Sequence, residues 1–354
     1  MSHAVMDKRP VAPRPATLAH ARLPRWAPAA IAAGSIALGC GLGLVADWHS
    51  KVQWGLVSAL LFVLITYVAT SLVEGKRQAK DRVATSLVWV SFVLAIVPLV
   101  SLAWTTAVRG SKALSGDFLG HSMAGLANTD EGGGVYHAII GTLEQVGIAT
   151  LISAPIGLLT AVYLVEYGRG KLARAVTFFV DVMTGIPSIV AGLFILSTWV
   201  LTFGMGFSGL AGALALAILM MPVVVRSTEE MLKLVPNELR EASLALGVPK
   251  WRTILKVVLP TAIGGITTGV MLAVARITGE TAPVMLLVFG NAFINNDPFN
   301  GAQSSLPLFV FEQYRIGTEA SYDRAWAAAL VLIAFVMILN LVARGIARWK
   351  APKH

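Results

Sequence analysis

Apolar residues fill the chain in eight long runs separated by shorter polar segments. The runs cover roughly residues 26–46, 54–73, 85–107, 139–166, 175–203, 207–225, 260–289 and 325–346. Each run is continuous rather than alternating, and each has the ~20 residues that a helix needs to cross the hydrocarbon core of a bilayer. A helix also satisfies its own backbone hydrogen bonds in lipid. The pattern therefore predicts an all-α, polytopic transmembrane helix bundle with about eight spans.

The composition and the placement of charge agree with this prediction. Of the 354 residues, 56% are hydrophobic and 13% are charged, against about 25% charged in soluble globular proteins. The net charge of +9 could suggest nucleic-acid binding, but cytoplasmic loops of membrane proteins collect Lys and Arg. With the N-terminus inside, 22 of the 28 Lys and Arg residues fall in inside segments and five in outside segments. We therefore expect both termini to be cytoplasmic and no nucleic acid to bind.

The polar segments define the expected parts of the chain. Residues 1–25 are expected to form a disordered basic cytoplasmic tail and residues 26–107 three N-terminal spans, the first of which is long enough to favour an uncleaved anchor over a signal peptide. An external loop is expected at 108–138 and a short basic cytoplasmic tail at 347–354. The single cysteine, Cys40, excludes an intrachain disulfide framework and a multi-cysteine metal site. We expect no metal site.

The longest inside connection, residues 226–259, has the pattern of two short helices. Pro236 can begin the first helix, Gly247 is suited to end it, Pro249 can begin the second, and Pro260 marks the expected join to the next span. Such a hairpin could fill a groove on a soluble partner. By periodicity alone, an amphipathic hairpin lying on lipid is an equally good interpretation.

Part of this connection resembles the EAA loop of bacterial ABC importer permeases. The matching residues are Glu241-Ala242-Ser243, Gly247 after three further residues, Val257 after nine more, and Leu259-Pro260. Ser243 replaces an Ala of the family pattern, and Val257 replaces an Ile. The resemblance implies that the loop docks on a cytoplasmic ATPase subunit and transmits its motion.

The resemblance carries the coupling role to Glu241 and Gly247, and the neighbouring Ala242 and Trp251 are expected to share it. The chain contains no Walker A sequence, because neither of its Gly-Lys pairs is followed by Ser or Thr. ATP and Mg²⁺ are therefore expected to bind to a separate partner ATPase. We expect this chain to be a transporter subunit and not an enzyme.

Among the ionisable residues within the predicted spans, four stand out: Glu144, Asp181, Arg276 and Glu280. A charge at the centre of a membrane helix costs about 2.5–3.5 kcal/mol on insertion scales, so these side chains are expected to face a cavity or another helix. Arg276 and Glu280 are four residues apart and should share one face of the seventh span. A guanidinium there could bind a tetrahedral oxyanion, or it could form a structural ion pair. Glu144 and Asp181 lie near the ends of their spans and are expected to cap or pair locally.

The fifth predicted span contains a helix-breaking sequence, Gly185-Ile186-Pro187. Proline lacks a backbone donor and kinks a helix. The freed carbonyls and the positive start of the second half can face a pore, where Ser188 would add a hydroxyl group. A packing kink without solute contact is the alternative.

Three segments resemble the A-type permease of phosphate ABC transporters: Ala275 to Pro283, Gly185 to Leu193, and Pro155 to Tyr167. The resemblance implies a type I ABC importer permease fold over residues 139–346, with the first two spans outside this core. It also implies a bacterial inner membrane and four kinds of partner: a homologous C-type permease, two ATPase subunits, an external phosphate-binding protein and membrane lipid. The expected substrate path contains Arg276, Glu280, Ser188 and Thr281, and the expected hinges are Gly185, Pro187 and Pro260.

Other functions stay open at the level of the residues. The chemistry of Arg276 would suit sulfate, molybdate or phosphonate as well as phosphate. A secondary transporter driven by an ion gradient could use Glu144, Asp181 and Glu280 as a proton relay. A membrane scaffold or sensor is a third class, in which Arg276 would have no role in transport.

Overall fold

The computed structural model describes residues 22–127 and 129–350, and most of the tail expected at 1–25 lies outside these ranges. The described chain is helical and has no β-strand, only one bridge between Phe289 and Gln303. It divides into two compact units, the first ending at Leu102 and the second beginning at Ala103. The predicted all-α fold is confirmed.

The first unit is a helical hairpin followed by the start of a long helix. It contains α1 (Ala27–Val45), α2 (Lys51–Val73) and most of α3 (Lys76–Ala113). Gly39 of α1 lies directly against Ser58 of α2, and Gly43 lies against the ring of Trp54. Small residues let two apolar helices approach closely where lipid offers no hydrophobic driving force. These two contacts therefore fix the pairing of α1 with α2.

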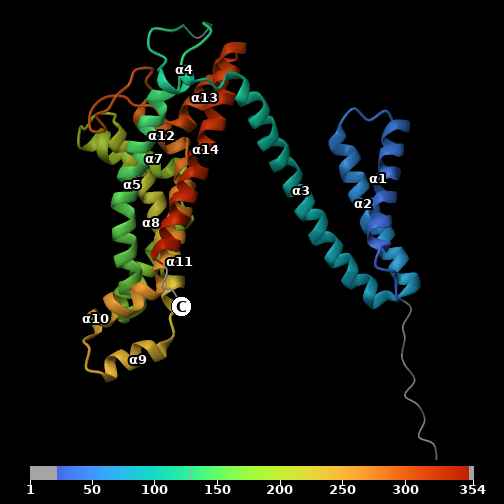
Figure 1. Cartoon of the computed structure of the whole chain (residues 1–354), viewed down its shortest axis with the longest axis horizontal. Helices are drawn as coiled ribbons and strands as arrows, with labels where there is room; N and C mark the ends of the chain where they lie inside the picture. The colour runs from blue at the N-terminus through green and yellow to red at the C-terminus, as the bar shows by residue number, and fades with distance from the viewer. Residues whose placement is uncertain (1–21, 128, 351–354) are drawn as a thin grey trace, which may run out of the picture. The chain divides into compact units, whose positions relative to one another are not determined.

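The second unit is a bundle around α8, as Figure 1 shows. Its helices are α4 (Gly116–Gly120), α5 (Tyr136–Val162), α6 (Gly170–Thr184), α7 (Ser188–Ile195), α8 (Gly209–Lys233), α9 (Asn237–Ala245), α10 (Lys250–Thr253), α11 (Leu259–Thr278), α12 (Ala282–Val288), α13 (Leu306–Ile316) and α14 (Glu319–Lys350). Three π-helical turns extend them: η1 (Tyr163–Tyr167), η2 (Leu196–Thr202) and η3 (Ile254–Val258). Helices α5, α11, α12 and α7 all pack on α8, whose side chains are largely buried.

Seven helices of the described chain are long and apolar enough to cross a membrane. The pair α6 and α7–η2 passes the same test as one span but is bent by 108°, which brings the count to eight. The bend lies at Gly185-Ile186-Pro187, where α6 ends and α7 begins. The prediction of a helix break at this sequence is confirmed.

Two helices extend into segments that the sequence analysis treats as connections or tails. Helix α3 continues to Ala113, past the start of the external segment expected at 108–138. It also contains the short helix α4, which Ser115 caps by accepting a hydrogen bond from the Phe118 backbone at 3.0 Å. Helix α14 runs to Lys350, so the first residues of the tail expected at 347–354 are helical.

The seventh predicted span, 260–289, is not one helix. Helix α11 ends at Thr278, and α12 begins at Ala282 with Pro283 near its start. Gly279 follows the last helical residue, a position that glycine commonly takes, and Pro283 has no backbone donor to continue the ladder. Arg276 and Glu280 therefore do not share a helix face, because Glu280 lies in the break between the two helices.

Pro260 lies in the first turn of α11, but no break separates α11 from the helix before it. Residues Lys250–Thr278 form one continuous candidate span, in which α10, η3 and α11 follow without a break. The π-helical turn η3 lies directly before Pro260 and takes up the irregular hydrogen bonding that a proline imposes on a helix. The second helix of the α9–α10 connection therefore continues directly into α11.

Helices α7 and α12 meet at a glycine, which yields a prediction for stability. A Cβ atom on Gly192 would lie 2.8 Å from the Cα atom of Pro283. We expect Gly192→Ala to destabilise the chain by roughly 1–3 kcal/mol, the usual cost of overpacking. The measurement is the thermal unfolding midpoint in detergent, with Gly147→Ala of α5 as the control because no atom lies within 4 Å of its added Cβ. Equal midpoints for the two variants would contradict the close contact.

Candidate functional site

Helices α9 and α10 form a hairpin that extends past the end of the bundle (Figure 1). Gly247, in the turn between them, has a φ of +76°, a left-handed conformation that favours glycine. Inside the hairpin the hydroxyls of Ser243 and Thr253 lie 2.9 Å apart and both residues are buried. This buried bond holds the two helices together, so that the hairpin is a defined structure and not a loose loop.

The outer surface of the α9–α10 hairpin carries the residues that the sequence singled out. Glu241, Ala242, Gly247 and Trp251 are all exposed. Leu246 and Trp251 are 83% and 53% exposed, which leaves large apolar side chains uncovered. An exposed apolar patch rimmed by polar residues is typical of a surface that binds another protein or a membrane.

Arg240 fastens the hairpin to the bundle. Its guanidinium bonds Glu166 of η1 at 3.0 Å, and it also donates to the carbonyls of Val235, at 2.5 Å, and Leu232, at 2.8 Å. The side chains of Arg240 and Glu166 are only 16% and 7% exposed. A charge-assisted pair that is shielded from water holds its geometry better than a surface pair. The hairpin is thus tied both to the end of α8 and to the end of α5.

Lys250 makes a second link between the hairpin and η1. Its ammonium group donates a hydrogen bond to the Glu166 carbonyl and lies 4.9 Å from the centre of the Tyr167 ring. A cation over an aromatic face contributes about 0.5–1 kcal/mol at exposed sites. Sequence reasoning missed Glu166, Arg240 and Lys250 as a group, since Glu166 is 74 residues from Arg240.

The expected path residues lie at three neighbouring places. Ser188 is the first residue of α7, Thr281 precedes α12, and Arg276 lies in the last turn of α11. Helices α7 and α12 pack on each other. Among the described residues, none forms a hydrogen bond or ion pair with the Arg276 side chain, which is exposed, or with that of Glu280. The alternative of a structural Arg276–Glu280 ion pair therefore finds no support within this chain.

The carboxylates of Asp181 and Glu144 both have partners, but on other elements and not locally as expected. Asp181 forms an ion pair with Arg226 of α8, which also bonds Glu229 at 2.7 Å. Glu144 of α5 accepts a hydrogen bond from the side chain of Gln303. A carboxylate held by a cation or an amide is poorly suited to a proton relay. These contacts weaken the interpretation as a gradient-driven transporter.

A buried amide pair that the sequence did not reveal joins α5 to the segment before α13. Gln145 donates to the Gln303 side chain at 3.0 Å and to the Ser304 carbonyl at 3.1 Å. Both glutamines are buried. A buried polar group is costly unless it is hydrogen-bonded, so the pair fixes the position of this segment. Polar Gln145 in an apolar run was the one signal that could have found it.

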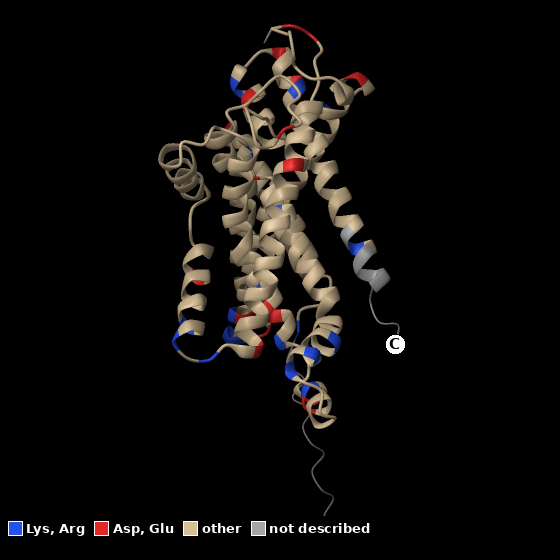
Figure 2. Cartoon of the chain, turned by 90° about the vertical axis from the view of Figure 1, so that its left-hand side faces the viewer, with Lys and Arg blue, Asp and Glu red and all other residues tan. Residues whose placement is uncertain are grey.

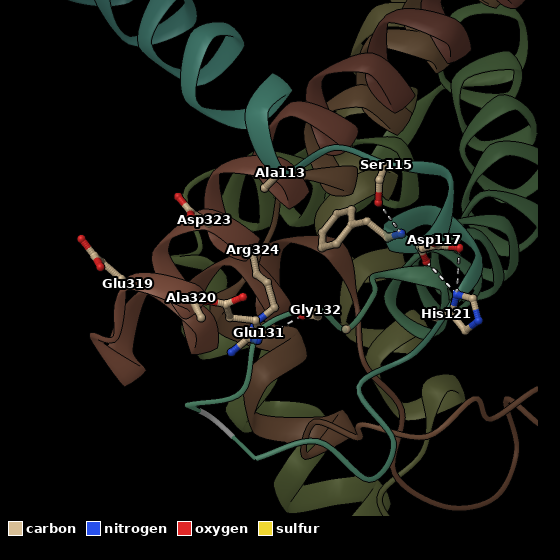
Figure 3. A pocket seen from close by; sticks show the side chains of 12 residues that line it. Ala113, Ser115, Asp117, His121, Glu131, Gly132, Glu319, Ala320, Asp323 and Arg324 are labelled. Carbon is tan, nitrogen blue, oxygen red and sulfur yellow. Dashed lines mark hydrogen bonds and ion pairs between the residues drawn. The ribbon is translucent and has the colours of Figure 1, made fainter.

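The end of the unit opposite the hairpin contains a cavity of about 750 Å³ between α4, the segment after it and the start of α14. Figure 3 shows Arg324 at its wall, pointing toward Gly132. Its guanidinium donates to Gln313 at 2.8 Å and to the carbonyls of Asp130 and Gly132 at 2.7 and 3.2 Å. Arg324 is 3% exposed and thus fastens this segment to α13 and α14.

Charge divides the second unit along its length. Lys and Arg gather near the end that carries α9 and α10, whereas the middle of the helices has few charged residues (Figure 2). A band of apolar surface between charged ends is expected for helices that cross a bilayer.

Comparison with known proteins gives the family. Residues 153–353 match the model of the family described as "Binding-protein-dependent transport system inner membrane component". The chain belongs to this family. The match covers more than half of the chain and includes α9, α10 and the helices on both sides of them.

Three curated relatives are each named as a phosphate transport system permease protein. The phosphate transport system permease protein PstA 1 of Mycobacterium tuberculosis strain H37Rv is 51% identical over 269 residues, which are 76% of this chain and 87% of the relative. The PstA protein of Mycobacterium leprae is 49% identical over 267 residues, which are 75% of this chain and 88% of the relative. The PstA protein of Pasteurella multocida is 39% identical over 269 residues, which are 76% of this chain and 94% of the relative. The similarity thus spans most of each relative.

A solved ABC transporter supports the fold. A chain of the bacterial alginate ABC transporter in complex with an alginate pentasaccharide-bound periplasmic protein aligns with a TM-score of 0.56 and 14% identity, covering 78% of this chain and 98% of its own. At this identity the likeness concerns the fold alone. The predicted ABC permease fold is confirmed, and the chain is an inner-membrane transport component.

Proposed function

We propose that the chain is the permease subunit of an ATP-driven phosphate importer and forms half of its translocation path. The observation that carries the proposal is the 51% identity to a protein named as a phosphate transport permease, over 87% of that protein's length. The exposed guanidinium of Arg276 supports it, because a phosphate oxyanion is well matched by a planar fork of donors. A permease for another oxyanion, such as sulfate or phosphonate, would use the same chemistry.

The α9–α10 hairpin is proposed to dock on a separate ATPase subunit that binds ATP and Mg²⁺. It extends past the end of the bundle, which supports a soluble partner, and it exposes Leu246 and Trp251, which that partner would cover. The link from Arg240 to Glu166 would carry the motion of the hairpin into α5, and the continuous helix from Lys250 would carry it into α11. The termini and the hairpin then lie on the cytoplasmic side.

The substrate path is proposed to run past Arg276. Ser188, at the break between α6 and α7, and Glu280 and Thr281, at the break between α11 and α12, would also line this path. Gly185 and Pro187 would serve as the hinge between α6 and α7. A homologous permease would cover the exposed face of α11, and an external phosphate-binding protein would deliver the anion. Transport requires two states of different affinity, and ATP binding to the partner would supply the difference.

The test is phosphate uptake by the assembled complex in proteoliposomes. ATP supplied on the side of the hairpin should drive uptake of radioactive phosphate, and uptake should cease without ATP. Sulfate in excess should compete only weakly. Uptake driven by a proton gradient in the absence of ATP, by this chain alone, would contradict the proposal and favour a secondary transporter.

The turn of the hairpin gives a second test of coupling. A β-branched residue at Gly247 would be strained at φ +76°. We expect Gly247→Val to weaken binding of the ATPase roughly tenfold, whereas Gly247→Asn, which tolerates the left-handed region, should bind nearly as the parent does. The measurement is co-purification of the ATPase at increasing salt. Equal loss in both variants would indicate that the conformation of this turn is not what the partner requires.

A further inference from the structure

A second cavity lies where η1, the end of α8 and the start of α10 meet. It has a volume of about 420 Å³. The ionisable groups that line it include the cations Arg169, Lys233, Arg240 and Lys250 and one carboxylate, Glu166. The spans α5–η1 and α8 end at Tyr167 and Lys233, so that the cavity lies at the level where membrane helices meet the headgroup region.

The carboxylate that lines this cavity already has an ion-pair partner. Glu166 pairs with Arg240, and its side chain is 7% exposed. Lys233 pairs with Glu229 at 2.7 Å. Lys250 has only neutral partners among the described residues, the Glu166 carbonyl and the Tyr167 ring. Within the same part of the chain, no residue bonds the side chain of Arg169. The charges of Arg169 and Lys250 thus stay uncompensated beside one cavity.

We propose that this cavity binds a phosphate-type oxyanion between Arg169 and Lys250. Such an anion would accept charge-assisted hydrogen bonds from both cations, neither of which pairs with a carboxylate of the described residues. The anion can come from two sources: the headgroup phosphate of an anionic lipid in the same leaflet, or free inorganic phosphate on the hairpin side of the membrane.

Occupancy would brace the α9–α10 hairpin. Arg169 precedes α6, whereas Lys250 begins α10, and an anion held by both would join the α5–α6 connection to the hairpin next to the Arg240–Glu166 pair. The consequence for transport rests on the proposed function, because the hairpin matters for transport only if it couples to an ATPase. The binding itself does not depend on that role.

The experiment measures amide hydrogen exchange of the full chain in nanodiscs without nucleotide or other subunits. One arm uses phosphatidylcholine discs titrated with inorganic phosphate against chloride at equal ionic strength. The other replaces part of the phosphatidylcholine with phosphatidylglycerol and omits phosphate. We expect slower exchange around residues 165–170 and 250–253 in at least one arm, and the responding arm identifies the source of the anion.

Matched variants distinguish a specific anion site from nonspecific electrostatic attraction of anions to the basic surface. Arg169→Ala should weaken the protecting interaction about tenfold or more, the loss expected for one charge-assisted bond. Lys171 lies two residues after Arg169, and its side chain does not line the cavity. Lys171→Ala removes the same charge and should leave the protection unchanged. Because the chain is measured alone, the result is independent of whether it proves to transport phosphate.

Two results would overturn the proposal. In the first, neither arm slows the exchange of these segments. In the second, protection is equal in Arg169→Ala and the parent chain. If the first result is found and Arg169→Ala reduces co-purification of an ATPase, Arg169 belongs to a protein contact instead.

Discussion

Replacing Arg276 with alanine should reduce phosphate uptake by the assembled complex about 10- to 100-fold. The side chain is exposed in the last turn of α11 and has no partner among the described residues. The loss of a hydrogen bond to a charged group costs about 1.5–3 kcal/mol, which corresponds to this range. Uptake of radioactive phosphate into ATP-loaded proteoliposomes measures the effect.

The Arg276→Lys variant provides the matched comparison. It keeps the positive charge but loses the planar fork that fits an oxyanion, so that uptake should fall between the parent and Arg276→Ala. The amount of assembled complex should be the same in all three proteins. Unchanged uptake by Arg276→Ala would remove this residue from the substrate path and leave it a packing role.

Replacing Arg240 with alanine should separate ATP hydrolysis from transport. The change leaves the carboxylate of Glu166 largely buried and unpaired and frees the carbonyls of Leu232 and Val235. Breaking a buried ion pair on one side costs about 3–5 kcal/mol. We expect the hairpin to remain able to touch the ATPase but to move α5 less, so that phosphate moved per ATP hydrolysed falls at least about tenfold.

Two further variants control this result. Arg174→Ala removes a cation of α6 that bonds Gly170 of the same helix, and its coupling ratio should match the parent. Glu166→Gln keeps an acceptor for Arg240 but loses the charge, and its ratio should be intermediate. If Arg240→Ala lowers hydrolysis and uptake by the same factor, the pair serves assembly or folding and not the transmission of motion.

The sequence alone predicted the features that rest on local chemistry. The apolar runs predicted the spans, because a stretch of ~20 apolar residues has few alternatives to a membrane helix. Gly185-Ile186-Pro187 predicted the break between α6 and α7, since a missing donor and a flexible glycine act within one turn. The hairpin was predicted from its own glycine and prolines.

The errors occurred where a helix ends or continues for reasons outside the local pattern. An apolar run does not reveal a short break, so the sequence predicts a helix through Gly279 and Glu280 where the structure has a turn. Pro260 predicts the start of a new helix, but it does not reveal that the π-helical turn η3 connects this helix to α10 without a break. Both errors concern hydrogen bonding of the backbone, which hydropathy does not report.

A single sequence does not show which distant residues pair with each other. Arg240 and Glu166 are 74 residues apart, and Gln145 and Gln303 are 158 residues apart. Each residue taken singly is an ordinary polar group at a helix end or in an apolar run. Only the packing of α5 against α8 and the segment before α13 brings the members of each pair into contact.

Site-directed crosslinking tests the central claim most directly. Glu241 is exposed on the α9–α10 hairpin, and Cys40→Ser gives a background without other cysteines. In this background, Glu241→Cys should crosslink to the ATPase subunit in inside-out membranes, with a yield that changes when ATP binds. Labelling of the same position by an impermeant thiol reagent from the cell exterior alone, with no crosslink to an ATPase, would contradict both the topology and the coupling role.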